Sequence, residues 1–91
     1  MPQVHRKDDR NTAGAPIIKV RQSRVYANNR LVSVDGSNVQ RHGPGKHAGP
    51  VTANGSRNVF IERIPVNFRG NADSCGHPRA AGSQNVFVNG A

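Results

Sequence analysis

Three short segments of β-branched and aromatic residues recur along this chain, and the recurrence extends beyond them. The segments are Val25-Tyr26-Ala27, Val59-Phe60-Ile61 and Val86-Phe87-Val88. Continuing the alignment of the first two copies without a gap places residues 31–36 on residues 65–70, and both stretches end in glycine. Each full unit is therefore a strand, a two-residue turn, a second strand and a glycine, which predicts a β-hairpin. Chance matching of short strands is the alternative, and the gap-free extension favours a repeat.

The residues between the paired segments suit tight turns in the first and third copies. Asn28-Asn29 and Asn89-Gly90 are typical of a type I′ turn, which needs positive φ at both central residues. Glu62-Arg63 suits that turn poorly, so the middle hairpin is the one that the sequence supports least.

The third copy stops at Ala91, directly after its turn, and lacks a second strand. The other end of the chain can supply one, because Pro2-Gln3-Val4-His5-Arg6 resembles Pro65-Val66-Asn67-Phe68-Arg69. We therefore expect the N- and C-terminal strands to pair and to close a ring of three hairpins.

The composition predicts one small all-β domain over residues 1–91 with a thin core. Ten glycines and six prolines interrupt every window long enough for a helix. Only 34% of the residues are hydrophobic and there is no tryptophan, so a metal, disulfides or a partner is needed for support. One cysteine cannot form an internal disulfide, which leaves a metal or a partner. The expected strands are residues 17–20, 25–27, 31–34, 59–61, 64–68 and 86–88.

Histidine and cysteine occur as two close pairs that together predict a metal site. His42 and His47 lie in a Gly/Pro-rich loop between the first two repeats, and Cys75 is followed two residues later by His77. On an extended segment, residues i and i+2 point the same way, so Cys75 and His77 can share one ion. Zinc takes four tetrahedral N or S ligands, and this set leaves no position for a catalytic water. N and S ligands also accept iron.

Interpretations of the same residues without a metal remain open. Cys75 can be an inert buried thiol, and the histidines can be solvated in their loops; we favour the metal. His5 lies in an expected strand, where we predict a surface or cross-strand residue, and it is the alternative ligand if one of the four is absent from the site.

The formal net charge of +8 indicates an anionic partner or simply a solvated basic surface. The longest basic run is Arg6-Lys7, which argues against a nucleic-acid-binding arm. There is no apolar run of about 18 residues, and the N-terminus lacks the apolar core of a signal peptide, so we expect synthesis in the cytosol.

The sequence does not favour an enzyme. Its acidic residues show no paired arrangement, and there is no glycine fingerprint for phosphate. Cys75 with a histidine could act as a thiol nucleophile, but a short Gly-rich scaffold leaves little room for a substrate cleft.

Two stretches of the chain, residues 64–77 and residues 82–90, resemble the PAAR-repeat proteins. In that family, Pro-Ala-Ala-Arg-like strands lead to Gly-Asp and then to a metal-binding Cys or His, and a Gly-Ser-x-x-Val-Phe-Val-Asn-Gly strand and turn follows. His42 and His47 fall where the family has a histidine-containing loop. The resemblance extends from about Gly36 to Ala91.

The resemblance implies a small cone of short β-hairpins with pseudo-threefold symmetry and a zinc-stabilised tip. It implies a structural role, in which one chain caps and sharpens a trimeric β-helical spike and touches the target envelope transiently. The expected location is the tip of a phage tail baseplate, or a protein secreted through a type VI apparatus. Because the chain ends at Ala91, we expect a bare tip without a toxin domain.

The chain departs from the family pattern at two places. The signature tetrapeptide is Pro65-Val66-Asn67-Phe68, which keeps only the proline, and Arg69 comes one place late. Residues 11–14 lack the histidine that many members have there, and His77 would replace it as the fourth ligand. The competing hypothesis is a small basic zinc-binding nucleic-acid-binding protein, although no specific nucleic acid is expected.

Overall fold

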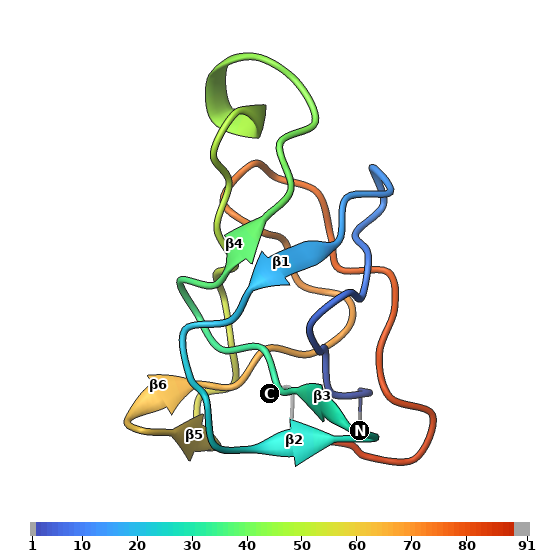
Figure 1. Cartoon of the computed structure of the whole chain (residues 1–91), viewed down its shortest axis with the longest axis vertical. Coiled ribbons are helices and arrows are strands. Elements are labelled where there is room, and N and C mark those ends of the chain that lie inside the picture. The colour runs from blue at the N-terminus through green and yellow to red at the C-terminus, as the bar shows by residue number, and fades with distance from the viewer. Residues whose placement is uncertain (1, 89–91) are drawn as a thin grey trace.

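The computed structural model describes residues 2–88, and over that range it is built from short antiparallel strands (Figure 1). β1 pairs with β4, β2 with β3, and β5 with β6. Residues 2–88 contain no α-helix, which confirms the all-β prediction. The elements are β1 (Ile17–Lys19), β2 (Tyr26–Ala27), β3 (Arg30–Leu31), β4 (Asn38–Val39), the 3-10 turn η1 (Gly45–His47), β5 (Phe60–Ile61) and β6 (Ile64–Pro65).

Both described hairpins turn in the same way. Asn28 and Asn29 have φ of 55° and 65°, and Glu62 and Arg63 have φ of 51° and 68°. Both turn residues of the middle hairpin thus have a left-handed backbone conformation, although Glu62 and Arg63 suit that conformation poorly. Its strands still pair, because Val59, Ile61 and Ile64 pack against the core. The Asn89-Gly90 turn lies outside the described residues.

Relieving the strain at the middle turn should stabilise the fold. A left-handed residue with a Cβ is disfavoured by about 1–2 kcal/mol relative to glycine. We expect Glu62→Asn with Arg63→Gly to raise the free energy of unfolding in urea by about 1–2 kcal/mol. Glu62→Ala with Arg63→Ala is the control, since it removes the same two charges but keeps both Cβ atoms; an equal gain in this control would show that charge, and not turn geometry, is responsible.

The two ends of the chain pair, as predicted. Gln3 lies opposite Phe87 in an antiparallel bridge, the N–H of Val88 donates to the carbonyl of Pro2 at 3.1 Å, and the N–H of Val4 donates to the carbonyl of Val86 at 3.0 Å. The last bond matches the one from Val66 to Val59 in the middle hairpin. These ends therefore form a third antiparallel pair of the same kind.

The N-terminal segment enters one residue out of the predicted register. Matching Pro2 with Pro65 would place Val4 with Asn67, whereas the hydrogen bonds place Val4 with Val66 and His5 with Asn67. The alternation of the strand decides the register, because it sends Val4 into the core and moves polar His5 to the position of Asn67.

A polar side chain fixes the entry to each of the three hairpins. Oε1 of Gln22 accepts the backbone N–H groups of the two residues before β2, at 2.8 and 2.9 Å. Oγ of Ser56 accepts the equivalent pair at 3.3 and 3.1 Å, and Oγ of Ser83 does so at 3.2 and 3.0 Å. Glutamine thus replaces serine in the first unit, and the repeat begins earlier than the apolar segments show.

A closed cycle of backbone hydrogen bonds joins the three repeat segments. The N–H of His5 donates to the carbonyl of Asn67 (3.1 Å), that of Asn67 to Ser33 (2.9 Å), and that of Ser33 back to His5 (2.9 Å). All three residues are fully buried. Because the cycle needs the N-terminal segment, the fold cannot close without it.

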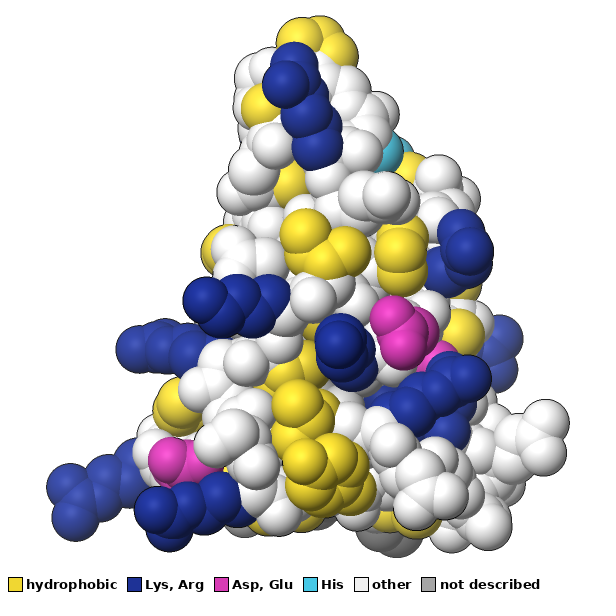
Figure 2. Space-filling model, viewed as in Figure 1, with side chains coloured by type: hydrophobic (Ala, Val, Ile, Leu, Met, Phe, Trp, Pro, Cys, Tyr) yellow, Lys and Arg dark blue, Asp and Glu magenta, His cyan; other side chains and the backbone are white. Residues whose placement is uncertain are grey.

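The core lies inside this ring and consists mainly of valines. In Figures 1 and 2 the molecule is broad at the end that holds β2, β3, β5 and β6, and it narrows toward η1. A second small cluster joins β1 to β4. The main cluster comprises Val4, Ala27, Val32, Val34, Val66, Phe68 and Val88.

His5 is not a surface residue, so that alternative was wrong, whereas its backbone hydrogen bonds to Asn67 and Ser33 agree with the cross-strand alternative. Its side chain is fully buried, and Nδ1 lies 2.7 Å from the carbonyl oxygen of Ala81. Among the described residues, Nε2 has no hydrogen-bond partner. Burial lowers the pKa of His5; the bond to Ala81 and the charge of Asp9 act in the opposite direction, and Arg79 lowers it further. His5 is therefore held neutral in the folded protein.

Acid should destabilise the fold through His5. The unfolded chain binds a proton near the ordinary histidine pKa of about 6.5, whereas the folded chain resists protonation until lower pH. Stability should therefore fall below about pH 6.5, by at most about 1.4 kcal/mol per pH unit. His5→Asn should remove this part of the pH dependence. Asparagine is chosen because Asn67 occupies the equivalent position in the middle unit. Urea unfolding at about pH 7.5, 6.5 and 5.5 measures it; parallel curves for both proteins would contradict the assignment.

Candidate metal centre

The four residues predicted as ligands lie together at the narrow end. One nitrogen each from His42, His47 and His77 and the sulfur of Cys75 all lie within 4.8 Å of one another. Cys75 is buried and the three histidines are partly buried. His5, the alternative ligand, is not in this group.

The distances between the donor atoms match a tetrahedral site. Zinc with Zn–N near 2.05 Å and Zn–S near 2.3 Å separates its nitrogens by about 3.3 Å and a nitrogen from the sulfur by about 3.6 Å. Nε2 of His42 lies 3.2 Å from Nδ1 of His77 and 3.1 Å from Nδ1 of His47. Sγ of Cys75 lies 3.6 Å from Nε2 of His42 and 3.5 Å from Nδ1 of His77. The cluster is therefore compatible with a bound metal.

The environment of His42 favours a metal over a network of hydrogen bonds. Nδ1 of His42 lies 2.9 Å from the carbonyl oxygen of Gln40. A carbonyl only accepts, so Nδ1 carries the proton and Nε2 has a free lone pair. That single lone pair faces His47, His77 and Cys75 at once. One lone pair cannot make good hydrogen bonds to three partners at once, whereas a single ion between them can bind all four donor atoms.

The first ligand pair is held by the loop that contains η1. The N–H of His42 donates to the carbonyl of His47 at 2.9 Å, which brings the two histidines side by side. Gly45 has a φ of +64° and lets the chain turn between them. Desolvation, with the nearby His42, His77 and Lys46, lowers the pKa of His47, which favours the neutral imidazole that metals bind.

The second ligand pair lies on a tight turn, and the predicted extended segment was wrong. The N–H of Gly76 donates to the carbonyl of Asp73 at 2.9 Å, and the N–H of Asp73 donates to the carbonyl of His77 at 3.0 Å. Gly76 has a φ of +92°, which a residue with a side chain rarely adopts. The turn, and not strand alternation, directs Cys75 and His77 to the same point.

Ser74 connects the two loops. Its N–H donates to the carbonyl of Val51 at 2.8 Å, and its Oγ accepts the N–H of Val51 at 3.0 Å. Val51 follows the histidine loop directly, so this pair of bonds sets one ligand pair against the other.

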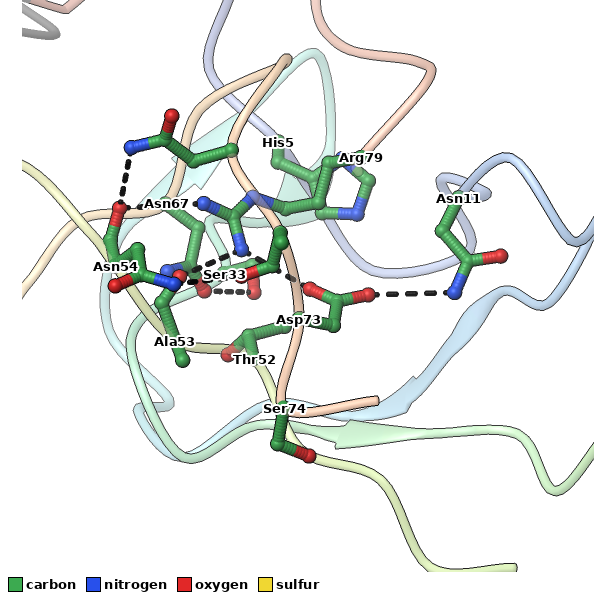
Figure 3. A network of polar contacts seen from close by, with 12 residues as sticks. His5, Asn11, Ser33, Thr52, Ala53, Asn54, Asn67, Asp73, Ser74 and Arg79 are labelled. Atoms are coloured by element: carbon green, nitrogen blue, oxygen red, sulfur yellow. Dashed lines mark hydrogen bonds and ion pairs between the residues drawn. The ribbon is translucent and has the colours of Figure 1, made fainter. Parts of the chain in front are cut away.

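A buried ion pair anchors the turn that carries Cys75 and His77 (Figure 3). Nη1 of Arg79 lies 3.0 Å from Oδ1 of Asp73, and both side chains are fully buried. Asn11 donates to the other carboxylate oxygen at 3.3 Å. Arg79 also donates to the carbonyls of Phe68 (2.7 Å) and Ala53 (2.8 Å). Burial lowers the pKa of Arg79, and the carboxylate of Asp73 counteracts this.

The sequence did not reveal this supporting network. No motif in the sequence singles out Asp73 or Arg79. The one available signal is position: Asp73 and Arg79 flank the Cys75 and His77 pair almost symmetrically.

Three aromatic side chains are exposed at equivalent positions of the three antiparallel pairs. Tyr26 is 59% exposed, Phe60 52% and Phe87 47%. They lie opposite Leu31, Pro65 and Gln3, respectively. Tyr26 and the residues on either side of Phe60 and Phe87 line an apolar hollow of about 210 Å³, whose full lining is Val4, Val25, Tyr26, Ala27, Val32, Val59, Ile61, Val66, Val86 and Val88.

The chain matches no protein-family model, and no curated protein matches it. Within residues 2–88 no helix is long and apolar enough to cross a membrane. Any functional assignment therefore depends on the residues themselves.

Proposed function

We propose that this protein is the structural tip of a contractile injection machine, as its resemblance to PAAR-repeat proteins implies. In this proposal one chain, a small cone with pseudo-threefold symmetry, caps the blunt end of a trimeric β-helical spike. The machine is a phage tail or a type VI secretion apparatus, and the tip meets the target envelope first. It carries out no catalysis.

The observation that supports this most is the placement of the two surfaces. Apolar side chains from three matching pairs are exposed at the broad end, and the four-donor cluster occupies the narrow end. An exposed apolar face of this kind is typical of an interface. A trimeric end is the partner that three matching contacts suit.

The proposed ion is one structural zinc held by His42, His47, Cys75 and His77. Four protein donors fill a tetrahedral sphere, so no position is left for a reacting water. At an apex with few apolar contacts, the metal would keep the loops rigid enough to transmit force.

The docking part of the proposal can be tested with a trimeric β-helical protein that has a blunt apolar end. We expect one chain to bind per trimer, measured by calorimetry. Phe60→Ser should weaken binding at least about tenfold, because an aromatic anchor is lost. Ile18→Ser is the matched control: Ile18 is 51% exposed but lies on β1, away from the broad end. Equal weakening by both variants would argue against docking through the broad face.

Nucleic-acid binding is the second candidate, and one observation favours it. Tyr26, Phe60 and Phe87 are exposed rather than buried in strands, and exposed aromatics with nearby arginines can stack bases. Salt-dependent binding of a single-stranded oligonucleotide, lost in Phe60→Ser, would support this alternative.

A further inference from the structure

The hairpins of the broad end carry arginines at their margins. Arg24 precedes the first hairpin and Arg30 begins its second strand, whereas Arg57 precedes the second hairpin and Arg63 lies in its turn; all four are exposed. Glu62 is the one acidic residue within residues 22–32 and 56–66. Figure 2 shows Lys and Arg side chains projecting around this end, over β5 and β6. We call these four residues the arginine rim.

Most of the rim has no acidic partner among residues 2–88. The described residues form ion pairs at three contacts, and Arg30 is the one rim residue among them. Its Nη1 lies 3.3 Å from Oδ1 of Asp9, yet its side chain is still 46% exposed. The rim therefore places positive charge beside two of the three antiparallel pairs at the broad end, and the described carboxylates neutralise little of it.

This charge decides among the possible occupants of the face. A second copy of the chain would bring rim against rim in a protein of net charge +8, and like charges at an interface are strongly disfavoured. A nucleic acid would use the arginines but would leave a valine-lined hollow unfilled. A protein end with an apolar centre and surrounding carboxylates complements both features.

We propose that the partner covering the broad face presents apolar side chains at its centre and a ring of Asp or Glu around them. This rests on the proposed function, in which the partner is the blunt end of a trimeric spike, and it specifies the chemistry of that end. The third pair, residues 2–4 with 86–88, contributes no arginine. A symmetric acidic trimer would therefore meet the arginine rim through two of its three chains.

The experiment compares two trimeric β-helical proteins with the same blunt apolar end, one ringed by glutamate and the other by lysine. We expect the full chain to bind the glutamate trimer at least about tenfold more tightly at about 50 mM salt, with the preference shrinking at about 500 mM. Arg57→Gln with Arg63→Gln should weaken binding to the glutamate trimer about three- to tenfold. Arg41→Gln with Lys46→Gln, the same charge loss at the narrow end, should leave it unchanged.

The outcomes distinguish a failure of the acidic ring from a failure of the proposed function. Equal, salt-insensitive binding to both trimers overturns the acidic ring and leaves the proposed function standing. If neither trimer binds, the proposed function fails, and this inference fails with it. A single-stranded oligonucleotide that binds more tightly than the glutamate trimer, through Arg57 and Arg63, assigns the rim to nucleic acid and overturns the proposal.

Discussion

Removal of the proposed metal ion is expected to lower the free energy of unfolding by at least about 4 kcal/mol, since structural zinc sites couple metal binding to folding. For a domain of this size that corresponds to a loss of about 20 °C in Tm. The loops of residues 41–50 and 73–77 contribute one buried apolar side chain, Cys75, apart from Pro50, so apolar packing stabilises them little. Cys75→Ser should reproduce most of this loss, because a serine hydroxyl is a far weaker ligand than a thiolate.

Thermal unfolding with and without a strong chelator measures the effect in both proteins. The chelator should shift the Tm of the native sequence strongly and that of Cys75→Ser only slightly. Ser74→Ala is the control, since it removes the Oγ bond to Val51 beside the ligands without removing a ligand. If the chelator leaves the native protein unchanged, the cluster is not a structural metal site. Cobalt substitution adds a spectroscopic check, because a tetrahedral ion with a thiolate absorbs in the visible range.

Arg79→Met is expected to destabilise the protein by about 3–5 kcal/mol, the usual result of removing one partner of a buried ion pair. The substitution leaves the carboxylate of Asp73 buried and leaves the carbonyls of Phe68 and Ala53 without their donor. It also removes the guanidinium that lies 5.8 Å from the centre of the Phe68 ring. Because Asp73 closes the turn that carries Cys75 and His77, metal affinity should fall about 10- to 100-fold.

A double-mutant cycle separates the ion pair from the rest. Asp73→Asn with Arg79→Met should be less destabilised than the sum of the single variants, because neither charge is then left alone. Arg69 is exposed and lies ten residues before Arg79, and Arg69→Met should change the free energy of unfolding by no more than about 0.5 kcal/mol. Additive single effects and unchanged metal affinity would show that the pair does not support the ligand turn.

The repeat could be predicted from the sequence because its hairpins use local signals. Alternating apolar residues and Asn-Asn at a turn occupy adjacent positions, so the β2–β3 hairpin followed from them. The pairing of the chain ends followed from the repeat itself, because the third copy lacks a second strand and residues 2–6 resemble residues 65–69. β4 was missed because Asn38-Val39 is too short and too polar to show a period. The N-terminal register was missed by one residue because the proline match competed with the alternation that buries Val4.

The cluster of possible metal donors could be predicted because few residue types bind zinc, and four such residues occur in two close pairs. What brings the pairs together could not, since it depends on contacts between residues far apart. The bonds of Ser74 to Val51 and of Arg79 to Asp73 and Phe68 have no sequence pattern of their own. The burial of His5 likewise follows from a hydrogen-bond cycle that closes in three dimensions.

The most direct test of the central claim is native mass spectrometry of the full chain mixed with a trimeric β-helical protein that has a blunt apolar end. We predict a complex of one chain, three partner chains and one zinc ion. The Cys75→Ser variant should lose the zinc, and the Phe60→Ser variant should lose the partner. A chain that carries no metal, or that never joins the trimer in this ratio, would contradict it.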